Sequence, residues 1–177
     1  DSPTGLTDAN TNYIKQALIG NVNTPSKVEV YVLPSTAEDY NDALEYFEEK
    51  SFIYMAIPEI ESGDVEDIET WIKAQRDTEK RNSCKLVIAN TGSDYEGIIN
   101  FGTDEVNVDD AAYTSAQFCA RIAGMLAGTP ITQSATYSVI PEATGCTKLG
   151  KADRSTAVGA GKLICFWDGE KVKLNRA

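Results

Sequence analysis

The stretch DDAAYTSAQFCARIAGMLAGTPITQSATY, residues 109–137, decides the fold of this chain. Small residues crowd its first part, and small residues let a helix lie close against a sheet or a second helix. We predict a buried helix that is capped by Asp109 and broken at residues 128–130, Gly-Thr-Pro. Tight packing accounts for the helix, but it gives no reason for the polar exit that follows it, residues 129–137.

Apolar runs and helical periodicities alternate before this helix. The predicted helices cover residues 8–19 with Thr7 or Asp8 as cap, a stretch after a Ser35–Glu38 capping box that reaches Phe47, and a stretch that opens at Asp64. The predicted strands are residues 28–33, 52–57, 85–89, 97–101 and 105–108. This order predicts an α/β fold, a mostly parallel sheet with helices on both faces.

The part after the central helix contains the clearest hairpin of the chain. Asp168-Gly169 separates two apolar runs, residues 163–167 and 170–174, which is a strong hairpin signal. We expect a single domain over residues 1–177. Its predicted parts are a core at 28–128, an irregular segment at 129–150, and a terminal helix and hairpin at 151–177. The opening without Met and the ending just after a strand favour a piece of a longer protein.

Composition excludes several classes of function. The net charge of −11 over 177 residues disfavours nucleic acid and anionic membranes as partners. No apolar run approaches the ~20 residues of a membrane span. The four cysteines form no CxxC pair and are expected to be reduced and mostly buried. The chain has no histidine, so a Ser-His-Asp triad cannot form.

The remaining chemical motifs have simpler structural explanations. Residues 159–162, GAGK, lack the first glycine of a phosphate loop and lead into a strand, where a phosphate loop leads into a helix. The carboxylates between Glu59 and Glu69 lack the order of a calcium loop and fit a solvated helix start. Trp71 and Trp167 fit core or interface anchors. We therefore predict no catalytic, cofactor-binding or metal-binding residues, and no cofactor.

Three stretches resemble the tail sheath proteins of contractile phage tails, above all the defective-prophage and contractile-bacteriocin type. They are residues 21–25 (NVNTP), residues 96–101 (EGIINF) and residues 121–137 (RIAGMLAGTPITQSATY). The closing GKLI and DGEKVK, at residues 161–164 and 168–173, are also similar to that family. The resemblance covers essentially the whole chain. It implies what is called a subtilisin-like sheath domain, a name for the fold only, within a larger sheath protein.

The resemblance implies a structural, non-enzymatic role. Subunits would stack as hexameric rings around a tail tube and contract to drive it through the target envelope. The implied partners are other copies of the chain, the tail tube protein and the baseplate, with no nucleic acid and no membrane insertion. The implied location is the tail of a phage or phage-like particle, assembled in the bacterial cytoplasm. Extended arms would add strands to neighbouring subunits, and the hairpin at 163–174 is our candidate for lying near such an edge.

Two other interpretations remain open. One is a Rossmann-like small-molecule-binding or hydrolytic domain with its site at the strand ends, near residues 90–94. An enzyme predicts a deep pocket with converging polar groups there, and a sheath domain predicts none. The other is a sheath from a related contractile machine, such as a secretion or toxin-delivery device.

Overall fold

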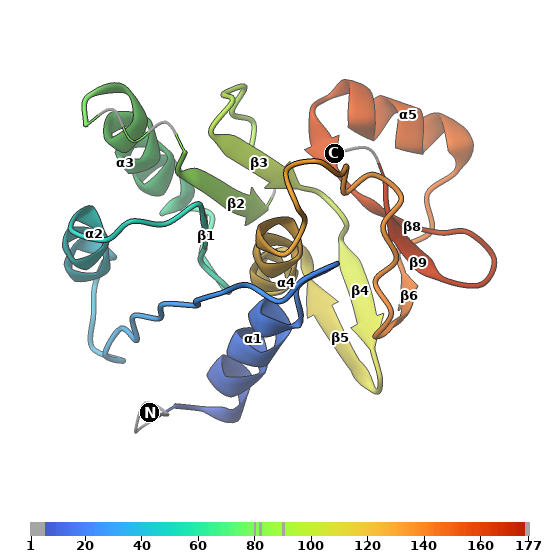
Figure 1. Cartoon of the computed structure of the whole chain (residues 1–177), viewed down its shortest axis with the longest axis horizontal. Helices are drawn as coiled ribbons and strands as arrows, with labels where there is room; N and C mark the ends of the chain where they lie inside the picture. Colours follow the sequence, from blue (N-terminus) through green and yellow to red (C-terminus); the bar gives the residue numbers. More distant parts are fainter. Residues whose placement is uncertain (1–5, 80, 82, 90, 176–177) are drawn as a thin grey trace.

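The computed structural model describes residues 6–79, 81, 83–89 and 91–175, arranged around one central helix, α4 (Ser115–Ala127) (Figure 1). The other helices are α1 (Asp8–Ile19), α2 (Asn41–Glu48), α3 (Val65–Asp77) and α5 (Lys151–Gly159). The strands are β1 (Tyr54–Ala56), β2 (Lys85–Ala89), β3 (Ile98–Phe101), β4 (Glu105–Val108), β5 (Ala111–Thr114), β6 (Ala143–Cys146), β7 (Lys162–Leu163), β8 (Cys165–Trp167) and β9 (Val172–Leu174).

The main sheet is parallel, in the order β1-β2-β3-β7. Successive residues of β2 point to opposite faces, so Leu86 and Ile88 enter the core with α3 while Val87 and Ala89 enter the core with α4. Both faces of the sheet are therefore covered by helices. The predicted α/β class, with a mostly parallel sheet between helices, is confirmed.

Two smaller antiparallel units complete the fold. The sheet β5-β4-β6 lies beside α4, and β8 pairs with β9 in a hairpin. The hairpin turns at Asp168-Gly169, and Gly169 has φ 113°, a left-handed value that favours glycine. The predicted Asp-Gly hairpin is confirmed, although it is separate from the parallel sheet.

The predicted start of the central helix is wrong. Asp109 does not cap it; this residue has φ 50° and lies in the turn between β4 and β5. The helix begins at Ser115, six residues later, behind a capping box. The Thr114 hydroxyl accepts from the Gln117 N–H, and the Gln117 side-chain oxygen accepts from the Thr114 N–H. Ala111 and Ala112 have helical propensity, but pairing with β4 makes them a strand.

Two further predictions about local structure are wrong. Residues 28–33 are extended but belong to no strand, because a groove separates them from β1 and they have no ladder partner among the described residues. The Ser35–Glu38 capping box does not form, since a turn closes there with the Ala37 N–H on Pro34 O at 3.0 Å. Helix α2 begins at Asn41 instead, and the Asn41 N–H donates to the Asp39 carboxylate at 2.9 Å.

The segment predicted as irregular, residues 129–150, contains strand β6. That strand pairs antiparallel with β4 and has a register irregularity at Asn107 and Val108. The rest of the segment has no helix or strand, apart from an isolated bridge between Val139 and Lys173. Helix α1 forms where it was predicted, and Thr7 caps it by accepting from the Asn10 N–H at 3.1 Å.

Candidate functional site

A pocket of about 640 Å³ lies at the carboxyl ends of the parallel strands. It is the place where the alternative, ligand-binding interpretation puts a site, because open α/β sheets bind ligands outside their strand ends. Its polar lining comes from α3, from the turn before it and from the loop after β2: Ser62, Glu66, Glu69, Thr70, Lys73, Thr91, Ser93 and Asp94. The sheath interpretation predicts no deep pocket with converging polar groups here, and the observed pocket is a hollow that is open to solvent.

Part of the polar lining of this strand-end pocket is bonded internally. Glu69, which is 7% exposed, accepts a hydrogen bond from the Thr91 hydroxyl and lies 3.8 Å from Lys73 Nζ. The Thr91 hydroxyl accepts from the Ser93 N–H at 2.9 Å, and the Asn100 amide donates to Thr91 O at 2.6 Å. Asn90, the first residue of the predicted site, lies outside the described residues. Among the described hydroxyl groups of the pocket, that of Thr91 bonds a carboxylate, but Thr91 is itself buried at 8% exposure. The pocket therefore offers mainly polar contacts.

Other chemical candidates take structural positions. Residues 159–162 end α5 and lead into β7, as the sequence predicts. Trp71 stacks on Phe52 with ring centroids 6.3 Å apart, and Trp167 is half-buried against the main core, so both are anchors. Within residues 6–175, no group of three or more Cys, Asp or Glu side chains among those described is placed to hold a metal ion.

All four cysteines are free and buried, as predicted. Burial raises the pKa of the Cys119 thiol to about 12, and burial also raises the pKa of the Cys165 thiol. A thiol acts as a nucleophile or metal ligand in its ionised form. These two cysteines therefore behave as small apolar core residues.

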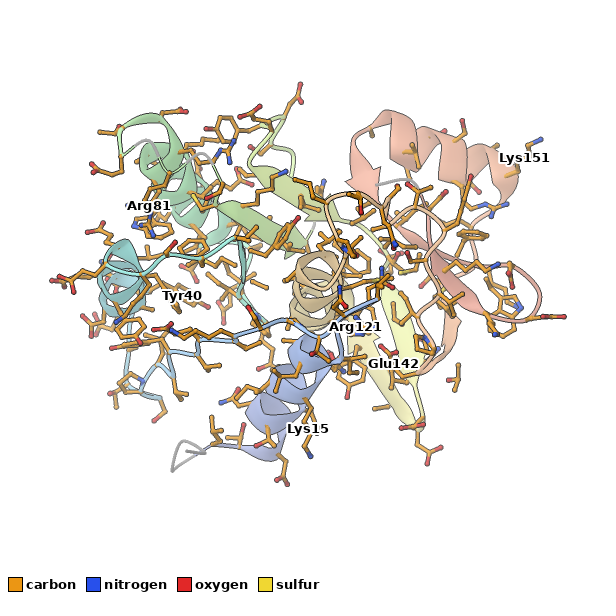
Figure 2. All side chains as sticks on the ribbon, in the orientation of Figure 1. Lys15, Tyr40, Arg81, Arg121, Glu142 and Lys151 are labelled. Atoms are coloured by element: carbon orange, nitrogen blue, oxygen red, sulfur yellow. The ribbon has the colours of Figure 1, made fainter. Side chains whose placement is uncertain are left out.

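Arg121, the first of residues 121–137, joins three distant parts of the chain. Arg121, on α4, is 1% exposed and its guanidinium forms an ion pair with Glu142, which follows the polar exit. The same guanidinium donates to Gly20 O, just after α1, at 2.8 Å. Figure 2 shows Arg121 and Glu142 together near the centre of the molecule. We call these three residues the Arg121 clamp.

Helix α1 and helix α4 touch through their backbones beside this clamp. A Cβ built on Gly124 would lie 2.0 Å from Ala17 O, and one on Gly128 would lie 2.1 Å from Asn23 O. Distances this short leave no room for any side chain at either position. The small residues that the sequence shows on the central helix are thus required where they face α1 and the turn that follows it.

The polar exit is held by specific hydrogen bonds. The Asn21 amide donates to the Thr129 hydroxyl at 2.8 Å and to the Ser138 hydroxyl at 3.3 Å. The Tyr137 N–H donates to Leu174 O at 2.9 Å, and an antiparallel bridge joins Val139 to Lys173, so the chain after the exit runs beside β9. Between these attachment points, Ile131 is fully exposed. The exit therefore shapes the fold at both ends and presents its middle to solvent.

No described helix is both long and apolar enough to cross a membrane. The remaining surface features are the strand edges. In the hairpin, the Asn175 N–H donates to Ile164 O. Because successive residues of an antiparallel strand alternate between bonding the partner strand and facing away, the backbone groups of Cys165 and Trp167 face away from β9. The Cys165 N–H donates to the Thr103 hydroxyl at 2.7 Å. No backbone hydrogen bond among the described residues reaches the outward groups of Trp167, so this part of the β8 edge is free.

Comparison with known proteins gives consistent matches over this architecture. Residues 34–176 match the model of the phage tail sheath protein central domain. A tail sheath protein from Clostridium phage phiCD119 is 36% identical over 99% of the chain, and the chain spans about half, 50%, of that protein.

Solved structures agree with the sequence matches. The sheath tail protein from Listeria innocua superposes with a TM-score of 0.74 at 28% identity, over 84% of this chain and 34% of that protein. The sheath tail protein from Desulfitobacterium hafniense superposes with a TM-score of 0.71 at 27% identity, over 76% of this chain and 33% of that protein.

Proposed function

The chain belongs to the phage tail sheath protein family, and from that premise we propose that it is a structural domain of a contractile tail sheath subunit. The full-length protein polymerises as stacked hexameric rings around a tail tube, and contraction drives the tube through the target envelope. Its partners are other copies of itself, the tail tube protein and the baseplate. It belongs to the tail of a phage or phage-like particle that is assembled in the host cytoplasm.

The observation that carries this proposal is the match of 99% of the chain to a tail sheath protein. The chain spans 50% of that relative, so the remaining regions of such a subunit supply further contacts. We propose that residues 1–177 act as one α/β domain in it.

The Arg121 clamp supports a mechanical role for this domain. When a sheath contracts, each subunit must move as one body while its contacts with neighbours change. Arg121 ties α1, α4 and the segment after the exit together in the interior, and Gly124 brings two helix backbones into contact. Buried ion pairs and close-packed backbones resist local distortion.

We further propose that the domain is not an enzyme. The chain has no histidine, and Glu69, Thr91 and Lys73 of the strand-end pocket are engaged with one another. Contacts between copies then carry the function, and strand addition at sheet edges supplies them. Within the hairpin we favour the edge of β8, because the residues from Tyr137 to Ile140 already occupy the outer edge of β9.

Electron microscopy of the full-length protein tests this proposal. Tubes or stacked rings are expected, and a protein that stays monomeric at all concentrations would refute the proposal. For the 177-residue chain alone we expect a monomer or weak oligomer in sizing and scattering. A stable hexameric ring formed by this chain would show that it already contains the ring contacts.

The strand-end pocket favours one second candidate, a domain that binds a small polar molecule. Its buried Glu69 and its Lys73 would contact hydroxyl, amine or carboxylate groups of the ligand. A thermal-shift screen of polar metabolites separates the candidates. A ligand whose stabilisation is lost in Lys73→Met, together with the absence of tubes, would favour binding over the sheath role.

A further inference from the structure

Residues 28–33, which we call the strap, run beside the parallel sheet without joining it. A groove of about 790 Å³ lies between the strap and β1, and its floor includes Ala17 and Gly124 of the helix pair. Apolar side chains along both of its walls remain exposed, with Val30 at 38%, Val32 at 41% and Ile53 at 58%. The groove is therefore a gap between two extended segments of the same chain (Figure 1).

The edge of β1 that faces away from β2 has free backbone groups. The Lys85 N–H bonds Ile53 O at 2.8 Å, so in the parallel ladder Ile53 and Met55 point toward β2. Tyr54 and Ala56 then turn their N–H and C=O groups outward, because successive residues of a strand alternate. Among the described residues, no backbone hydrogen bond reaches these outward groups or joins the strap to another segment.

Chain connectivity places the strap next to this edge. The strap leads through α2 into β1, and β1 leads through α3 into β2; α2 and α3 contribute to the same core on one face of the sheet. A crossover between two parallel strands is right-handed. Two crossovers that pass over the same face of a sheet therefore place each new strand on the same side of the one before it. The strap therefore belongs on the side of β1 opposite β2.

The strap has the composition of a strand. Its sequence, VEVYVL, is rich in β-branched and aromatic residues, which favour a pleated, half-buried environment. Figure 1 draws it as a stretched trace without helix or turn, and Pro25 and Pro34 flank it in the chain. Little rearrangement within the segment is needed for pairing.

We infer that the strap closes on β1 as a fifth parallel strand, which gives the order strap-β1-β2-β3-β7. Closure satisfies the outward N–H and C=O groups of Tyr54 and Ala56 and fills the groove. Closure also covers the β1 edge of this sheet, so a strand from a second copy no longer finds free backbone groups there. The strap thus controls whether the β1 edge is available to another chain.

Amide hydrogen exchange of the 177-residue chain, resolved by residue, tests this inference. The Met55 N–H faces β2 and is protected whether the strap is open or closed, so it serves as the internal reference. Closure predicts that the Tyr54 and Ala56 amides exchange slowly, within about tenfold of Met55. Exchange of both at the rate of an unstructured peptide would overturn the inference.

Proline substitutions identify the strap as the partner. Adjacent residues of a strand point their N–H groups to opposite sides, so only one of Val30 and Tyr31 can donate to β1. We expect one of Val30→Pro and Tyr31→Pro to accelerate exchange at Tyr54 and Ala56 at least tenfold over its matched alanine variant, Val30→Ala or Tyr31→Ala. The other proline should match its alanine control. Equal exchange for proline and alanine at both positions would mean that another segment or a second copy covers β1.

Discussion

The helix pair α1–α4 lines the floor of one groove, and the corner formed by the strap, α2 and β1 lines its walls, yet the two regions are packed in different ways. In the pair, Gly124 and Ala17 meet backbone to backbone, and the Arg121 clamp fixes the chain on both sides. In the corner, Val30, Val32 and Ile53 stay exposed and the strap has no ladder partner among the described residues. The sequence features that identify the family therefore coincide with the part of the domain that admits least change.

This difference separates two kinds of stabilisation. The pair depends on shape and on one buried ion pair, so single atoms matter there. The corner depends on apolar contact at a surface, which tolerates substitution. Mutations of the two regions should therefore differ strongly in their cost.

The largest effect is expected for Arg121→Met. This change leaves the Glu142 carboxylate and Gly20 O without their buried partner, which costs about 3–5 kcal/mol in the free energy of unfolding. Urea unfolding measures it. A double variant, Arg121→Met with Glu142→Gln, should regain part of the loss because no unpaired charge remains. If the single variant costs less than about 1 kcal/mol, the clamp is not a main stabilising contact.

A smaller loss is expected for Gly124→Ala. The added Cβ would lie 2.0 Å from Ala17 O, so α1 must move outward, at about 1–3 kcal/mol. Gly124→Leu should cost a few kcal/mol, because more atoms must be accommodated. The control is Gly159→Ala in α5, where an added Cβ has no neighbour within 4 Å and alanine favours the helix. Equal melting temperatures for the two alanine variants would show that α1 is not held against α4 in solution.

The buried thiols predict a moderate loss of stability at alkaline pH. Unfolded cysteine ionises near pH ~8.5, whereas burial raises the pKa of Cys119 to about 12. The folded state thus keeps a proton that the unfolded state releases, so stability is full below about pH 8.5 and declines from there toward pH 12. Melting temperatures between pH 7 and 10 measure the decline, which should be shallower in Cys119→Ala. An unchanged slope would mean that other groups cause it.

The smallest effect is expected in the corner, for Ile53→Ala. This side chain is 58% exposed, so its truncation should change the free energy of unfolding by less than about 0.5 kcal/mol. The same substitution at Ile122 on α4, which is fully buried, should cost about 2–5 kcal/mol. Urea unfolding of both variants makes the comparison. Similar costs at the two positions would remove the contrast between the regions.

The sequence predicts those elements whose structure is decided locally. β2 occupies the predicted residues because a continuous apolar run suits a strand buried on both faces, and α1 begins at its Thr7 cap. The β4–β5 hairpin was missed because Ala111 and Ala112 have helical propensity and only pairing with β4 overrides it. A signal was present in Tyr113-Thr114, since both residue types favour strands.

The candidate sites were less predictable, because they join residues that are distant in the chain. Arg121 and Glu142 are 21 positions apart, and Arg121 reaches Gly20 across 101 positions. No local pattern links them, although an arginine in the middle of an apolar helix indicates that a partner must exist. The position of the strand-end pocket follows from the topology of the sheet, but its internal Glu69–Thr91 bond does not.

The passage from β7 to β8 has one mechanical consequence. Ile164 alone separates the last strand of the parallel sheet from the hairpin, and β9 is bonded to β8 on one side and to the residues from Tyr137 to Ile140 on the other. A pull on Asn175 along β9 therefore loads both rows of hydrogen bonds in shear, many at once, and does not peel them apart singly. The load then reaches the parallel sheet through β7 and α4 through the exit, which divides the tension between the two halves of the domain.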